Sequence, residues 1–220
     1  MKCFVCRTDI VEMLSFHNLF ERPHLLCERC RIHMAECMLD STNRCPYCKG
    51  CLTDEQCMTC AHLSDCPVRF NQIFAPFCYA NFMKELIQQY KFMKDVALAE
   101  VIARYMIWPQ LTYDWIIPIP SSPSNDQART FNPVKYVLTA RGIAFQDILT
   151  MPNRHKQFDL TKKERFRISN EIHVSDGINL ENKSILLVDD IYTTGKTAHN
   201  AAIKLFQSKV RKLDMLTFAR

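Results

Sequence analysis

The sequence predicts an α/β protein of two parts, in which a cysteine-rich segment precedes a mostly parallel sheet flanked by helices. Eleven of the 12 cysteines lie before position 67, so the first part carries the cysteine chemistry. After position 80, helical and strand-like patterns alternate, which is typical of a parallel sheet with helices on its faces. With 220 residues, 23% of them charged, and four glycines, the chain is neither disordered nor of low complexity.

The alternation consists of short apolar runs and longer segments with helical spacing. We expect buried strands at 115–117, 143–149, 184–188 and 213–218. We expect helices at 81–92, 133–141 and 197–206, and one more that Asp95 caps and that ends before Pro109. The helix at 133–141 has clear end signals, because Asn132 is a good N-cap and Gly142 stands where a helix stops.

Four Cys-x-x-Cys pairs predict metal binding: Cys3 and Cys6, Cys27 and Cys30, Cys45 and Cys48, Cys57 and Cys60. Two residues between cysteines let both sulfurs of one tight turn reach an ion at about 2.3 Å, and two such turns complete a shell of four thiolates. We therefore expect two structural Zn²⁺ sites, formed by the first two and the last two pairs. Interleaved pairing, iron in place of zinc, and Cys51 as a substitute ligand stay open. Gly50 is expected to take the positive φ that follows the second sulfur of the third pair.

Charge and hydropathy restrict the compartment and the partners. The first seven residues leave no room for the apolar stretch of a signal peptide, and no uncharged run reaches the length of a membrane span. We therefore expect a cytoplasmic protein without a membrane span, where thiols stay reduced. Eight metal-bound thiolates and two Zn²⁺ ions lower the formal net charge from +5 to about +1, so net charge is no argument for nucleic-acid binding.

The segment 185–197, I-L-L-V-D-D-I-Y-T-T-G-K-T, predicts a ligand site at a strand end. Backbone N–H groups of 193–197 at the helix start form a natural phosphate cradle. Asp189 and Asp190, expected about one residue beyond the strand, are placed to accept hydrogen bonds from vicinal sugar hydroxyls. Phosphate and diol at this separation describe a ribose 5-phosphate. A nucleotide-hydrolase P-loop is excluded, because that motif requires glycine at position 190.

This segment resembles the phosphoribosyl-pyrophosphate (PRPP) motif of type I phosphoribosyltransferases. With the cysteine pairs, the whole chain resembles the ComF/ComFC family of competence proteins. Further matches to that family are Tyr90-Lys91-Phe92, Ile117-Pro118-Ile119-Pro120, and Gln157 with Arg165 to Asn170. The resemblance implies a double zinc ribbon over 1–66, a linker over 67–80 and a type I phosphoribosyltransferase-like domain over 81–220.

The resemblance also implies roles for particular residues, although none for a catalytic one. Asp189 and Asp190 would bind the ribose hydroxyls of PRPP, directly or through Mg²⁺. The rest of the PRPP-binding set would be Thr193, Thr194, Gly195, Lys196 and Thr197. Ser121, Ser122 and Arg129 match the pyrophosphate loop, and Arg154, Lys156 and Arg165 match a mobile lid. Two departures stand out: Thr130 and Pro133 replace the Gly and Gln of R-G-F-N-Q, and Thr193 stands where purine-salvage relatives commonly carry an acid.

The function implied is uptake or processing of single-stranded transforming DNA by a protein that binds PRPP or a related ribose phosphate. Single-stranded DNA and a competence helicase are the expected partners. The alternatives are a Mg²⁺-dependent phosphoribosyltransferase with an unknown acceptor, and a regulator that senses PRPP. Candidate DNA contacts are the basic and aromatic residues Arg7, Phe16, Arg22, Arg29, Arg31, Arg44 and Tyr47.

Overall fold

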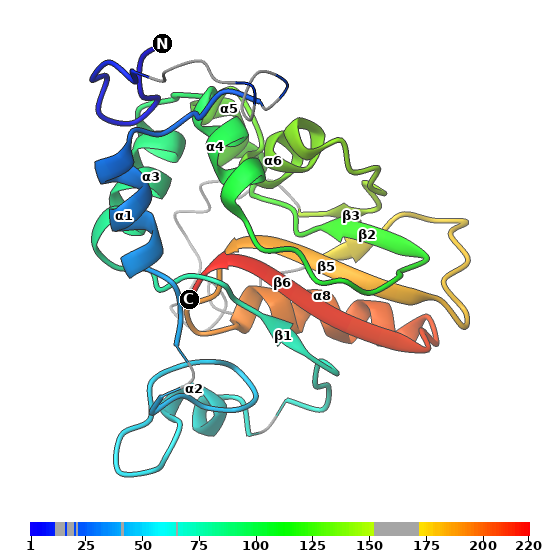
Figure 1. Cartoon of the computed structure of the whole chain (residues 1–220). Helices are drawn as coiled ribbons and strands as arrows, with labels where there is room; N and C mark the ends of the chain where they lie inside the picture. The colour runs from blue at the N-terminus through cyan, green and yellow to red at the C-terminus, as the bar shows by residue number, and fades with distance from the viewer. Residues whose placement is uncertain (12–15, 17–19, 21, 41, 65, 152–171) are drawn as a thin grey trace, which may run out of the picture.

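A computed structural model of the chain describes residues 1–11, 16, 20, 22–40, 42–64, 66–151 and 172–220. Its centre is a four-stranded sheet in the order β1-β6-β5-β2, in which every neighbouring pair is parallel (Figure 1). The strands are β1 (Ile73–Phe74), β2 (Trp115–Pro118), β5 (Ser184–Ile191) and β6 (Lys212–Ala219). The predicted parallel sheet is therefore confirmed.

Helices cover both faces of this sheet. In the described part of the chain after residue 80 they are α3 (Asn81–Phe92), α4 (Leu98–Tyr105), α5 (Pro123–Arg129), α6 (Pro133–Arg141) and α8 (Lys196–Gln207). Leu186 and Val188 of β5 pack in one core with α3, α4 and α6, whereas Ile185 and Leu187 pack in a second core with α8. Figure 1 shows α8 on the opposite side of the sheet from these three helices. The apolar run of β5 is thus a strand buried on both faces.

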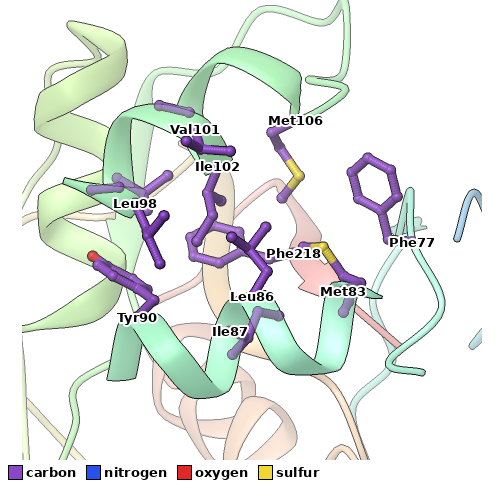
Figure 2. Close-up of a cluster of buried hydrophobic side chains, with 14 of the residues drawn as sticks. Phe77, Met83, Leu86, Ile87, Tyr90, Leu98, Val101, Ile102, Met106 and Phe218 are labelled. Carbon is purple, nitrogen blue, oxygen red and sulfur yellow. The ribbon is translucent and has the colours of Figure 1, made fainter. Parts of the chain in front are cut away.

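The pair α3 and α4 packs through large apolar side chains. Figure 2 shows Met83 and Leu86 of α3 facing Ile102 of α4, together with Phe218 of β6. Tyr90, which is 1% exposed, donates a hydrogen bond from its hydroxyl to the carbonyl oxygen of Pro133 at 2.8 Å. This bond connects the carboxyl end of α3 to the start of α6. It thereby restrains the position of Lys91, the next residue of α3.

Two expected elements differ from the structure. The expected strand over 143–149 is wrong for most of its length: only Leu149–Thr150 (β3) is a strand, and it pairs antiparallel with His173–Val174 (β4) outside the main sheet. The reason is local, because Ile143 donates its N–H to the carbonyl of Leu138 in the closing turn of α6. Asp95 does not cap α4, whose N-cap is Ala97.

The cysteine-rich part packs directly against the sheet domain. Cys3 and Cys30 belong to the core with α3 and α4, whereas Cys45 and Cys48 belong to the core with α8. Its helices are α1 (Glu28–Glu36), which lies beside α3, and α2 (Met58–His62) (Figure 1). The segment 67–80, expected to be a linker, supplies the edge strand β1. The domain boundaries at 66 and 80 stay a prediction.

The longest helices that the structure describes have 12 residues. Among the described residues, no helix has the length and apolar character that crossing a membrane requires.

Candidate functional site

The eight paired cysteines form two groups of four sulfurs, Cys3/Cys6/Cys27/Cys30 and Cys45/Cys48/Cys57/Cys60. Sulfur–sulfur distances are 3.5 Å for Cys6 to Cys27, 3.7 Å for Cys45 to Cys60 and 3.3 Å for Cys48 to Cys57. A tetrahedral ion with sulfurs at about 2.3 Å places its ligands ~3.8 Å apart, so both groups fit Zn²⁺. The pairing is consecutive rather than interleaved, and Cys51 belongs to neither group of the described residues.

Each group joins a tight turn to the start of a helix. The first two cysteines of a group lie in the turn, and the third is the N-cap residue of a helix, Cys27 for α1 and Cys57 for α2. The fourth sulfur then comes from the first turn of the helix, so a spacing of two residues serves both the turn and the helix. A closed shell of four thiolates leaves no open position for substrate, and such sites are structural.

The expectation that Gly50 takes a positive φ in the turn of the second group is wrong. The residue with positive φ after the second sulfur is Lys49, at 61°, and Arg7 has the same role in the first group, at 62°. Gly50 leaves room for the guanidinium of Arg220 instead, because a Cβ atom there would lie 2.3 Å from its Nη2.

Three thiols in the two groups have a lowered pKa: Cys6 and Cys27 in the first group and Cys48 in the second. A hydrogen bond with the Thr8 hydroxyl at 2.9 Å is the main reason that the pKa of Cys6 falls to about 5. Burial raises the pKa of Cys48, but hydrogen bonds from Arg220 and from the Gly50 backbone outweigh burial and bring it to about 7. Thiolate is the form that binds a metal ion, so both groups hold a sulfur that ionises readily.

The second candidate site begins at the carboxyl end of β5. Asp189 and Asp190 lie within this strand, which runs to Ile191, and not one residue beyond it as expected. The carboxylate of Asp189 accepts a hydrogen bond from the backbone N–H of Asp190 at 2.8 Å. Burial and the charge of Asp190 raise the pKa of Asp189 to about 7, against the opposing charge of Lys91. Two carboxylates packed this closely favour a ligand that brings hydroxyl donors or a cation.

The turn after β5 is shaped by Tyr192 and Gly195. Tyr192 is 1% exposed and donates its backbone N–H to the carbonyl of Ala219 at 3.0 Å. Gly195 has φ 74°, and a Cβ atom there would lie 2.2 Å from the hydroxyl of Tyr192, so the turn requires glycine. α8 starts at the next residue, Lys196. Thr193 and Thr194 are exposed at the helix start, where an anion is favoured by the free N–H groups and the helix dipole.

The segment after β2 runs beside the acidic strand end. Ile119 donates its backbone N–H to the carbonyl of Val188, the residue before Asp189, at 2.8 Å. Ser122 is buried and is the N-cap residue of α5. The Ser121 hydroxyl accepts a hydrogen bond from the side chain of Asn132 at 3.0 Å. Both serines predicted for the pyrophosphate loop therefore follow a strand whose end adjoins the acids.

The predicted loop arginine reaches the same end of α3. The guanidinium of Arg129 lies 5.7 Å from the ring centroid of Phe92, the last residue of that helix. Thr130, which stands at the glycine position of the family motif, has φ 73°. The loop thus keeps a backbone conformation that suits glycine although the residue is β-branched.

Lys91 is a site residue that sequence reasoning did not single out. Its Nζ lies 2.5 Å from Oδ2 of Asp190, and the two side chains are 12% and 16% exposed. The only sequence signal was its position in the Tyr90-Lys91-Phe92 match, because a partner 99 positions away on β5 leaves no local pattern. The expected lid residues Arg154, Lys156 and Arg165 and the segment from Gln157 to Asn170 lie outside the described residues.

A parallel sheet with an acidic strand end and a threonine-rich turn, joined to two four-cysteine groups, defines a phosphoribosyltransferase-like protein with a double zinc ribbon. The chain is 29% identical over 231 residues to the competence protein ComFC of Streptococcus pneumoniae (strain ATCC BAA-255 / R6), covering 100% of this chain and 99% of the relative. It is 25% identical over 235 residues to the competence protein ComFC of Bacillus subtilis (strain 168), covering 99% and 94%. The chain is thus similar over its whole length to ComFC competence proteins, as its motifs predict.

Two further comparisons are less informative. No family model matches the chain. Among solved structures, an allosteric regulatory enzyme of purine biosynthesis has a TM-score of 0.36 at 14% identity, with 58% of this chain and 25% of that chain covered. A hypoxanthine phosphoribosyltransferase from Staphylococcus aureus has a TM-score of 0.28 at 14% identity, with 61% of each chain covered. Scores this low carry no argument, so the fold assignment rests on the sheet, the cysteine groups and the relatives.

Proposed function

We propose that this chain is a competence protein that binds PRPP, or a related ribose phosphate, with Mg²⁺ at the carboxyl end of β5. The observation that carries the proposal is the placement of the Asp189–Asp190 pair directly before a turn that requires Gly195 and leads into the start of α8. Carboxylates for a diol and N–H groups for a phosphate then lie on one short segment, in the order that a ribose 5-phosphate needs.

Each element of the proposed site has a separate task. Asp189 and Asp190 accept hydrogen bonds from the ribose hydroxyls, and Thr193, Thr194, Gly195, Lys196 and Thr197 surround the 5′-phosphate. Lys91 holds Asp190 in place, and Ser121, Ser122 and Arg129 face the pyrophosphate. The carboxylates of Asp189 and Asp190 would hold Mg²⁺, which would neutralise charge on the pyrophosphate.

Binding is better supported than transfer to a purine. The position where purine-salvage relatives commonly carry an acid is the exposed Thr193, whose hydroxyl is no proton acceptor at neutral pH. We therefore propose a PRPP-binding protein in which the zinc groups, with their closed shells, are structural. Zn²⁺ fits both groups of thiolates by distance and by donor type.

The proposed role in handling single-stranded DNA rests on the two ComFC relatives, whose names state competence. The structure narrows the candidate contacts within the chain. Arg7 pairs with Asp95, Arg31 pairs with Glu28, and Arg44 donates to the sulfurs of Cys51 and Cys78. Of the remaining candidates, Phe16, which is 97% exposed, Arg22 and Arg29 are exposed. Exposed aromatic rings suit base stacking, and exposed arginines suit phosphate contacts.

Isothermal titration of PRPP into the zinc-loaded chain, with and without Mg²⁺, tests the ligand. We expect one PRPP per chain, with binding that depends on Mg²⁺. The double variant Asp189→Asn/Asp190→Asn keeps the size of both side chains but loses two charge-assisted hydrogen bonds of about 1.5–3 kcal/mol each, so binding should weaken at least about a hundredfold. Asp147→Asn, at an exposed ion pair with Lys135, is the matched control and should bind as the parent does. Absence of PRPP binding in the parent would refute the proposal.

The DNA role is tested separately with a fluorescent single-stranded oligonucleotide. We expect anisotropy to report binding whose affinity falls steeply with salt, because phosphate contacts release counterions. Phe16→Ala and Arg29→Gln should weaken binding, whereas Arg7→Gln should have little effect, since its side chain is engaged with Asp95. Binding whose affinity changes neither with salt nor in Phe16→Ala and Arg29→Gln would contradict this assignment of the DNA surface.

A further inference from the structure

The guanidinium of Arg220 lies between the second cysteine group and the turn after β5. On the cysteine side, its Nε donates to the carbonyl oxygen of Cys48 at 2.9 Å, and its Nη2 lies 3.5 Å from the sulfur of the same residue. Nη2 also donates to the hydroxyl of Thr59 in α2 at 2.8 Å. Cys48 lies in the turn of this group and Thr59 between its last two cysteines, so Arg220 contacts both halves of the metal site.

On the other side, the same guanidinium holds the proposed phosphate-binding turn. Nη1 donates to the carbonyl oxygens of Tyr192 at 3.1 Å and of Thr193 at 2.8 Å. The charge also lies 5.2 Å from the ring centroid of Tyr192, within the range of a cation–π contact. Tyr192 in turn contacts the space that a side chain at Gly195 would fill. One planar group thus fixes the first residues of the turn.

The position of Arg220 is set by its backbone and by Gly50. Its N–H donates to the carbonyl of Phe77 at 2.9 Å, and its carbonyl accepts from the N–H of Tyr79 at 2.8 Å. Because a Cβ atom on Gly50 would lie 2.3 Å from Nη2, the metal-binding turn has glycine where the guanidinium passes. All three guanidinium nitrogens have partners, and a fork of this shape is available only to arginine.

We propose that Arg220 is a positioning residue that couples the second zinc group to the phosphate-binding turn. The proposal rests on the proposed function, because it assigns the turn to a phosphate. With zinc bound, Cys48 and Thr59 hold the guanidinium, which holds the carbonyls of Tyr192 and Thr193. Loss of the metal releases the guanidinium and loosens the turn. Thermodynamic linkage makes the effect reciprocal: a phosphate ligand that orders the turn also favours retention of zinc in the second group.

Hydrogen exchange of the full chain tests the coupling without any phosphate ligand. In the parent, we expect removal of zinc by a chelator to speed exchange in peptides that span 190–198, and to leave those that span β2 unchanged. In Arg220→Lys, which keeps the charge but cannot reach both sides, these peptides should exchange fast with zinc bound and change little when zinc is removed. Arg211→Gln, with an exposed side chain near the start of β6, is the control and should behave as the parent does.

A second arm measures the reverse direction by zinc release to a metallochromic chelator. PRPP with Mg²⁺ should slow the release of one of two zinc ions at least about tenfold in the parent, a coupling of ~1.4 kcal/mol, and should have no such effect in Arg220→Lys. If the parent does not bind PRPP, the proposed function fails, and the exchange arm alone decides on Arg220. The coupling is refuted if zinc removal leaves exchange at 190–198 unchanged in the parent. It is also refuted if Arg220→Lys behaves as the parent does in hydrogen exchange or, where the parent binds PRPP, in zinc release.

Discussion

Lys91 Nζ lies 2.5 Å from Asp190 Oδ2, and this ion pair joins the carboxyl end of α3 to the carboxyl end of β5. Both side chains are mostly buried, at 12% and 16% exposed. Asp189, beside this pair, has its pKa raised to about 7 by burial and by the charge of Asp190. Lys91 therefore compensates the negative charge of the strand end before any ligand binds.

Lys91→Met should reduce the free energy of unfolding by about 2 kcal/mol, because it leaves a mostly buried carboxylate without its partner. Urea denaturation measures the loss. The control is Lys135→Met, whose ion pair with Asp147 is 29% and 50% exposed and should contribute less than about 1 kcal/mol. Equal losses for the two variants would mean that the pair of Lys91 and Asp190 has no special energetic role.

Thr130→Gly should stabilise the protein by about 1 kcal/mol. Thr130 is β-branched and has φ 73°, a conformation that glycine adopts without steric cost. The control is Thr139→Gly, which removes the same side chain from an exposed position in α6 and should destabilise by about 0.3 kcal/mol. Thermal unfolding of both variants checks the sign, and a lower melting temperature for Thr130→Gly would contradict the expected strain.

His199 should make stability depend on pH. It is 3% exposed, and burial lowers its pKa below the ordinary value of about 6.5. The folded state keeps this imidazole neutral, whereas the unfolded state takes up a proton below pH ~6.5, so the stabilisation is present above that pH and is lost as the pH falls further. His199→Gln should flatten the decline between about pH 6.5 and 5. His33→Gln, at an exposed position, should leave it unchanged.

The zinc groups predict which cysteine pairs share an ion. Native mass spectrometry should find two zinc ions in the parent. Cys6→Ser with Cys27→Ser changes one group and should leave one ion, whereas Cys6→Ser with Cys57→Ser changes both groups and should leave none. Loss of both ions from the first double variant would contradict the consecutive pairing.

Local sequence patterns predicted the elements whose cause is local. The apolar run of β5 and the helical stripe of α3 are buried as their periods require, and the cysteine spacing fits turns and helix starts. The strand expected over 143–149 was wrong. Ile143 donates its N–H to Leu138 in the closing turn of α6, and apolar composition alone does not predict this hydrogen bond.

Long-range partners account for what the sequence did not predict in the site. Lys91 of α3 pairs with Asp190 of β5, and Arg220 contacts Cys48 at a separation of 172 residues. Asp95 was expected to cap a helix, but its carboxylate pairs with Arg7 at 2.6 Å. Gly50 was expected to supply a positive φ. Instead, its missing side chain leaves room for the guanidinium of Arg220. None of these contacts leaves a signal at the spacing of a turn, helix or strand.

The contact between the acidic pair and a sugar diol is tested on the unmodified chain by comparing ribose 5-phosphate with 2-deoxyribose 5-phosphate in isothermal titrations with Mg²⁺. The two ligands share the phosphate and differ in one hydroxyl. If Asp189 and Asp190 accept hydrogen bonds from vicinal hydroxyls, the deoxy sugar loses one bond to a charged acceptor, about 1.5–3 kcal/mol, and should bind at least about tenfold more weakly. Equal affinity for the two sugars would contradict the assignment of the acidic strand end to ribose.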